Sequence, residues 1–273
     1  MLVKLFSILL LPILSFAQQH GSLADSTIAA RYAHAVDLFY EHDDTGEALD
    51  EARNEFATIV HADPRHAPSL AYLGIIALEK NSLRSADSLL TLALASDSTC
   101  PEAHVGRAQW FRQRQHWQEG FNEARRAVTL APKSALARRE LVTELLHRVE
   151  TPVTERDLKE AIPHLQTLLE FDANDRDAHH DLAQSYEQLK RWKEAAIEYQ
   201  EVLRIGQTSE DMDVWVYTVH LDAARCFENF GDFKQAVEEL KFYVDAIKEL
   251  GSDNEEIKNI IEQIHQLEQR DHK

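Results

Sequence analysis

The stretch "AVTLAPKSAL" (residues 127–136) has close counterparts at four other places in the chain. They read "TIVHADPRHA" (58–67), "TLALASDSTC" (91–100), "LLEFDANDRD" (168–177) and "VLRIGQTSED" (202–211). In each, an apolar helix-like run gives way to turn residues, which end at Pro64, Ser98, Pro132, Ala173 and Gln207. The successive steps are 34, 34, 41 and 34 residues. A period of 34 residues is typical of a repeat built from two helices and a turn.

The residues between these turns align once units are started at Ala67, Pro101, Ala135, Arg176 and Tyr217. The eighth position then holds small or short residues: Gly74, Ala108, Val142, Ala183 and Ala224. The second helix shows the same discipline when seven extra residues are allowed in the third unit, with Ala86, Gly120, Ala161, Ala195 and Ala236 in register. Two antiparallel helices approach closely only where a side chain is small, so this pattern predicts stacked helical hairpins.

This pattern resembles the tetratricopeptide repeat family over residues 33–250, and "AHHDLAQSYEQLKRWKEAAIEYQEVL" and "AYLGIIALEKNSLRSADSLLTLAL" are the best single matches. The resemblance implies an all-α fold, a right-handed α-α superhelix of about six units followed by a C-terminal capping helix. The expected units are 33–66, 67–100, 101–134, 135–175, 176–209 and 217–250.

The two ends of the chain lie outside this array. Residues 1–17 have a Lys4 n-region, an apolar run and small residues before a cleavage site, which predicts a secretory signal peptide. Residues 18–32 form an N-terminal segment, and residues 251–273 form a capping helix and tail. Ser252 and Glu255 have capping-box spacing. A single apolar stripe then follows at helical spacing: Ile257, Ile260, Ile261, Ile264 and Leu267. We expect a lid on the array, with a dimer interface as the competing interpretation.

Composition narrows the class of function. The formal net charge of −18 disfavours nucleic acid and anionic membranes as partners, although residues 101–149 form a locally basic segment. The chain has no nucleophile elbow, phosphate loop or zinc-protease motif, so we expect no enzyme and no cofactor. We expect Cys100 and Cys226 to be free thiols in an exported protein, periplasmic or secreted, which is a monomer or weak homodimer without a membrane-inserted mature chain.

The family resemblance implies that the first helix of each unit lines a concave groove that binds an extended or helical peptide of a protein partner. The groove residues that we single out are Gln109, Arg112, Gln113, Arg139, Thr143, His180, Gln184 and Arg225. Arg112 and Arg139 are the expected anchors for an acidic part of the peptide facing the basic middle units. The Arg107 stem packs in the helix seam with its head near water or Glu102, or else it contributes to the basic segment.

Two alternatives stay open. Asp177, His180 and Asp181 share one helix face and form a potential site for a divalent ion, although the main interpretation has no metal. A structural envelope component that self-associates through the last helix is the other. The recurring fourth-position residues His104, His179 and His220 are interpreted as packing residues beside the helix seam.

Overall fold

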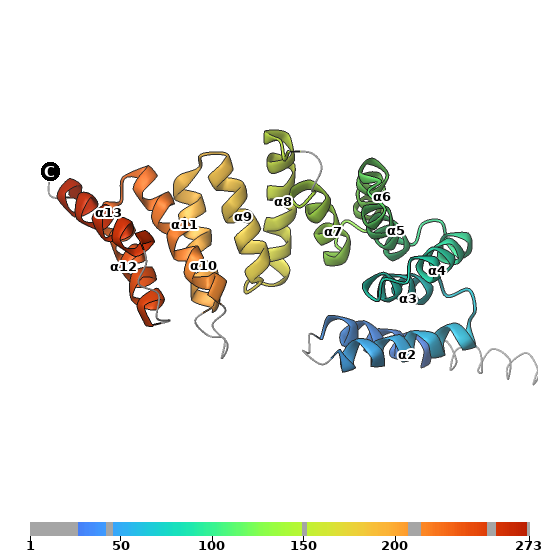
Figure 1. Ribbon diagram of the computed structural model, residues 1–273. Coiled ribbons are helices and arrows are strands. Elements are labelled where there is room, and N and C mark those ends of the chain that lie inside the picture. Colours follow the sequence, from blue (N-terminus) through green and yellow to red (C-terminus); the bar gives the residue numbers. More distant parts are fainter. Residues whose placement is uncertain (1–26, 42–45, 149–151, 207–213, 250–254, 272–273) are drawn as a thin grey trace, which may run out of the picture. The chain divides into compact units, whose positions relative to one another are not determined.

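The computed structural model describes residues 27–41, 46–148, 152–206, 214–249 and 255–271. The expected signal peptide (1–17) and Ser252 lie outside these residues. Throughout the described ranges, every regular element is helical. The chain divides into two compact units, Met1–Pro132 and Lys133–Lys273, and each is described by itself (Figure 1).

The first unit contains a helix over residues 27–40 and five further helices. These are α2 (Glu47–Ala62), α3 (Ala67–Glu79), α4 (Leu83–Ser96), α5 (Pro101–Gln113) and α6 (Trp117–Leu130). Helix α3 packs against α4, α5 packs against α6, and α5 also contacts both helices of the preceding pair. The buried Phe56 ring stacks on the Tyr72 ring with centroids 4.7 Å apart, which joins α2 to α3.

The second unit contains seven helices, and each contacts the next along the chain (Figure 1). They are α7 (Ala135–Leu146), α8 (Glu155–Phe171), α9 (Arg176–Gln188), α10 (Trp192–Gly206), α11 (Val214–Phe230), α12 (Phe233–Glu249) and α13 (Glu255–Asp271). Helices α3, α5, α7 and α9 begin at the residues that start the units in the sequence. Helix α11 begins three residues earlier than Tyr217.

The turn inside four of the helical hairpins uses one geometry at one position. The fifteenth residue of each has a positive φ: Asn81 (54°), Gln115 (63°), Lys190 (58°) and Gly231 (94°). The next residue donates its amide hydrogen to the carbonyl five residues back, at 2.7 Å for Ser82 to Ala77 and 2.9 Å for Asp232 to Phe227. This left-handed cap satisfies the last carbonyls of the helix and reverses the chain.

The recurring stretch at the end of each unit is also a turn with a definite geometry. Asp63, Asp97 and Asp172 each follow a helix and accept, through their side chains, the amide hydrogen two residues later. Such side-chain turns compete with helical hydrogen bonding and stop the helix. The next helix then starts with its own cap, as Ser134 and Asp175 do for α7 and α9.

Helix α13 covers the end of the second unit. Ile257, Ile260, Ile264 and Leu267 are buried, and α13 contacts α12. Its polar side also reaches α11, because Gln263 donates to Glu228 at 3.0 Å and Arg270 pairs with the same carboxylate at 3.1 Å. The apolar stripe is therefore occupied within the chain.

Both cysteines are free and buried, Cys100 in the first unit and Cys226 in the second. Burial, followed by the neighbouring Glu102, raises the pKa of Cys100 to about 12. Burial, followed by Glu187, raises the pKa of Cys226 to about 12 as well. Among the helices of the described ranges, none has the length and apolar character needed to cross a membrane.

Candidate functional site

A cavity of about 340 Å³ lies between α7, α8 and α9 in the second unit. Apolar side chains supply part of its wall: Val142, Leu165, Leu168 and Ala178. Polar side chains supply the remainder: Arg139, Thr143, His147, Asp177, His180 and Asp181. An apolar wall with a few polar groups is the usual composition of a binding pocket. Three of the residues singled out from the sequence, Arg139, Thr143 and His180, meet here.

Helical spacing explains why these side chains converge. Arg139, Thr143 and His147 are four residues apart at each step, so they follow one face of α7 and its C-terminal end. Asp177, His180 and Asp181 follow the equivalent face of α9. The Thr143 hydroxyl donates to the Arg139 carbonyl at 2.9 Å within α7.

Two ion pairs hold α7 and α9 together at the cavity. The Arg139 guanidinium pairs with Asp175 at 2.5 Å, and the other oxygen of Asp175 accepts the amide hydrogen of Ala178 at 3.1 Å. The His147 Nε2 lies 3.1 Å from an Asp181 carboxylate oxygen. Arg139 and His147 remain half exposed, whereas Asp175 and Asp181 are largely buried. The carboxylates therefore fix the position of cationic side chains that solvent can reach.

A second polar cluster continues from the cavity toward α11. His180 lies edge-on against the Tyr199 ring, and the Tyr199 hydroxyl donates to Glu187 at 2.8 Å. Glu187 also pairs with Arg225 at 2.5 Å. Arg225 in turn pairs with Asp222 at 2.6 Å. The polar groups of α9, α10 and α11 therefore form one connected network.

The pKa values of this cluster shift in directions set by burial and pairing. Burial raises the pKa of Tyr199, and the Glu187 carboxylate that accepts its proton raises it further. Burial also raises the pKa of Asp222, against the opposing effect of Arg225. Hydrogen bonding to Glu187 raises the pKa of Arg225. Arg225 therefore stays charged and is engaged with two carboxylates of its own chain.

Gln184 lies between the cavity and this cluster, with its Nε2 3.5 Å from the His180 ring nitrogen. The other residues singled out from the sequence belong to the first unit: Gln109, Arg112 and Gln113, all in α5. The Gln113 side chain donates to the Leu78 carbonyl at 3.3 Å, across the join between α5 and the end of α3.

Arg107 takes a structural position in the first unit. Its guanidinium pairs with Asp87 of α4 at 2.5 Å and donates to Thr91 at 3.0 Å. It also lies 5.0 Å from the centroid of the Trp110 ring. The expectation that its head reaches Glu102 is wrong, because the side chain extends across to α4 rather than along its own helix.

The Asp177, His180 and Asp181 face does not assemble a metal centre. Within the ranges that the structure describes, no group of three or more His, Cys, Asp or Glu side chains is placed to hold an ion. Asp181 is paired with His147, and the His180 ring is packed against Tyr199.

Several residues of the site were not singled out from the sequence. His147, Asp175 and Glu187 each bridge two helices, and their partners lie at least 34 residues away in the chain: Asp181, Arg139 and Arg225. The repeat register offers one signal, since each pair joins similar positions of successive first helices.

A tetratricopeptide repeat model matches residues 153–213. With the all-helical units and their regular turns, this match decides the architecture. The chain is built from tetratricopeptide repeats. No curated protein sequence matches it.

Solved tetratricopeptide repeat structures resemble this chain in fold. One is YrrB, described as a TPR protein with an unusual peptide-binding site, at 18% identity and a TM-score of 0.55 over 70% of this chain and 91% of that one. Another is PilF of Pseudomonas aeruginosa, at 16% identity and a TM-score of 0.59 over 88% and 99%. A third is MamA, at 16% identity and a TM-score of 0.52 over 66% and 91%. The expected all-α repeat solenoid is thereby confirmed.

Proposed function

We propose that this protein is a non-catalytic interaction scaffold that binds a peptide segment of a protein partner across α7 and α9. The cavity of about 340 Å³ between these helices carries the proposal. Tetratricopeptide repeat folds serve generally as scaffolds for protein partners, and the printed description of YrrB names a peptide-binding site in that protein.

The walls of the cavity suggest the chemistry of the segment. Val142 and Leu168 offer an apolar surface for one aliphatic side chain. Arg139 is half exposed, and a guanidinium has five N–H donors, so its bond to Asp175 leaves donors for a partner carboxylate. We therefore propose a segment in which an apolar residue lies near an acidic one.

Site-specific photocrosslinking tests this assignment in the native cell. A photoreactive phenylalanine derivative at Thr143 should form adducts with one partner, because this side chain lines the cavity. The same derivative at Lys159, an exposed position on α8, is the matched control and should form few adducts. Equal adduct yields at both positions would contradict the proposed site.

A cavity-filling variant tests the same site by a second route. Thr143→Trp should lower the yield of the captured partner at least tenfold, because the indole occupies the space that the peptide needs. The variant removes only a hydroxyl bond within α7, so the melting temperature should change little. Lys159→Trp is the control, and unchanged capture by Thr143→Trp would overturn the proposal.

A further inference from the structure

One side-chain pair recurs inside the helical hairpins, between the fourth residue of the first helix and a residue 19 positions later in the second. His104 contacts Glu123, His179 contacts Glu198, and His220 contacts Glu239. The third hairpin joins Arg138 to His164 at 2.9 Å, 26 residues apart because of its seven extra residues. In the hairpin of α3 and α4, the same positions hold Leu70 and Leu89, which pack in one apolar cluster.

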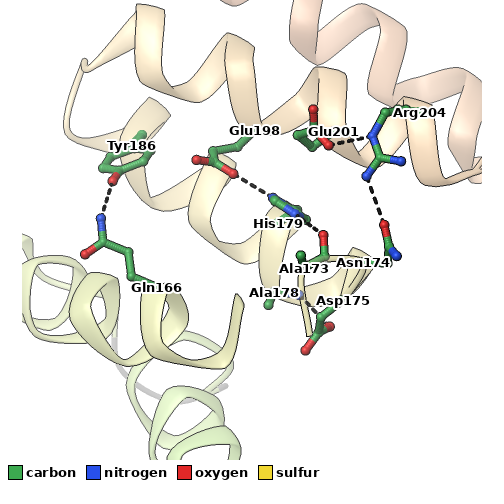
Figure 2. Close-up of polar contacts among 10 residues, drawn as sticks. All are labelled: Gln166, Ala173, Asn174, Asp175, Ala178, His179, Tyr186, Glu198, Glu201 and Arg204. Atoms are coloured by element: carbon green, nitrogen blue, oxygen red, sulfur yellow. Dashed lines mark hydrogen bonds and ion pairs between the residues drawn. The ribbon is translucent and has the colours of Figure 1, made fainter. Parts of the chain in front are cut away.

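Two of these histidines have an acceptor at each ring nitrogen. The His179 Nδ1 lies 2.7 Å from a Glu198 oxygen, and its Nε2 lies 3.2 Å from the Ala173 carbonyl oxygen (Figure 2). His104 repeats this geometry, at 2.5 Å from Glu123 and 3.1 Å from the Ser98 carbonyl. A neutral imidazole has only one N–H, so it would leave a lone pair facing an oxygen. Both contacts become hydrogen bonds only in the doubly protonated ring.

His220 differs in a way that the helix boundaries explain. Helices α5 and α9 begin three residues before their histidine, so the carbonyl six residues back belongs to the preceding turn. Helix α11 begins six residues before His220, so the equivalent carbonyl lies inside the helix. Within the described residues, only the Nδ1 of His220 has an acceptor, Glu239 at 2.6 Å, and the ring stacks on Phe242.

The charges around each ring come from several elements. His179 faces Glu198 and Glu201 of α10, and Glu201 is paired with Arg204 at 2.7 Å (Figure 2). His104 faces Glu123 of α6 and Asp97 of the preceding turn. His220 shares a cavity of about 290 Å³ with Arg204, Glu238 and Glu239. Each buried ring therefore has a carboxylate close by to stabilise its charge.

The pKa of His179 follows from these contacts. Burial lowers it, but the bond to Glu198 and the bond to the Ala173 carbonyl outweigh burial, and the net pKa lies above the ordinary value. A histidine whose pKa is raised by folding stabilises the protein fully below about pH 6.5, the unfolded value, and loses that contribution as the pH rises through the folded value.

We propose that His104 and His179 are pH-sensitive clips, which in their doubly protonated form fasten the turn before a hairpin to the second helix of that hairpin. Deprotonation removes one of the two hydrogen bonds and releases the turn. In the second unit that turn contains Asp175, which caps α9 and pairs with Arg139, so the clip also supports one wall of the cavity. The inference stands on the contacts of the two rings and does not depend on the proposed peptide binding.

Nitrogen-detected NMR of the full chain, labelled in histidine, tests the protonation state directly. Between pH 5.5 and pH 9.5, His104 and His179 should remain doubly protonated at pH values where the exposed His116 and His265 have lost their proton. The exposed rings serve as controls within the same sample. If His179 loses its proton together with His116 and His265, the proposal is wrong.

A variant that copies the chain's own apolar pair tests the effect on stability. His179→Leu combined with Glu198→Leu installs the pair found at Leu70 and Leu89, and a well-packed apolar pair replaces a buried ion pair at little cost. From pH 6 to pH 9 the melting temperature of the unmodified protein should fall by about 2–4 °C more than that of the variant. Equal falls would overturn the proposal, and the NMR titration decides it if the variant does not fold.

Discussion

At the scale of single residues, the close approach of successive helices depends on glycine at two positions of the first unit. Leu90 of α4 is fully buried and lies against both Gly74 of α3 and Gly106 of α5. A Cβ at Gly74 would lie 2.7 Å from the Leu90 Cγ, and a Cβ at Gly106 would overlap Leu90 Cδ2. One leucine thus fills the space that two missing side chains leave, and it ties two hairpins together.

We predict that Gly106→Ala lowers the free energy of unfolding by about 1–2 kcal/mol. Overpacking a core costs about 1–3 kcal/mol, and the gain of about 1 kcal/mol in helix propensity offsets only part of it. Urea unfolding measures the difference. In a Leu90→Val background the same substitution should cost less, because the clashing methyl group is shortened. A cost that is equal in both backgrounds would show that Leu90 is not the obstacle.

At the scale of elements, the hairpin turns rely on a left-handed residue that only Gly231 supplies without strain. Asn81, Gln115 and Lys190 adopt positive φ at the same position and bear the steric cost of a side chain. The turn survives because the amide of the following residue closes onto the carbonyl five residues back. Its geometry therefore matters more to the fold than the residue type.

We predict that Gly231→Val lowers the free energy of unfolding by about 1–2 kcal/mol, because a β-branched residue is disfavoured at a φ of 94°. Gly231→Asn should cost clearly less, since asparagine tolerates the left-handed region. Thermal and urea unfolding of both variants would give the comparison. Equal costs for valine and asparagine would mean that lost flexibility in the unfolded chain, and not strain, is responsible.

At the scale of the whole molecule, the last helix ends the array by covering it. Ile257 and Leu267 are almost completely buried in the same chain, and the polar side of α13 pairs with α11 and α12. A repeat array needs such a cover, because an uncovered terminal hairpin would expose an apolar face.

We predict that Leu267→Ala lowers the free energy of unfolding by about 2–5 kcal/mol without changing the oligomeric state. Unfolding experiments at several protein concentrations, with light scattering, test both parts. Glu262→Ala, at an exposed position of the same helix, should have little effect. If Leu267→Ala instead converts a dimer into a stable monomer, the stripe belongs to an interface between two copies.

The sequence predicts the elements of this fold far better than the contacts between them. The small residues at the eighth position predict the starts of α3, α5, α7 and α9, because helix packing requires them at a fixed interval. The division of the chain after Pro132 has no such signal, since the repeat pattern continues across it.

The candidate site shows the same limit. Thr143 and His180 are predicted to share a face, and they line one cavity. The partners of Arg107, Arg139 and His179 lie on other helices, and a single sequence gives only their register. The recurrence of glutamate 19 residues after His104, His179 and His220 is the one such pairing that the printed sequence already contains.

The third hairpin has a further consequence for the history of the chain. Its seven additional residues fall between Leu146 and Glu155, and the clasp of Arg138 with His164 is formed despite them. Growth of the linker was therefore invisible to the packed helices, and natural selection had no structural reason to remove it. The same spot invites a protein engineer to graft a foreign epitope there, where added length leaves the hydrophobic interior undisturbed.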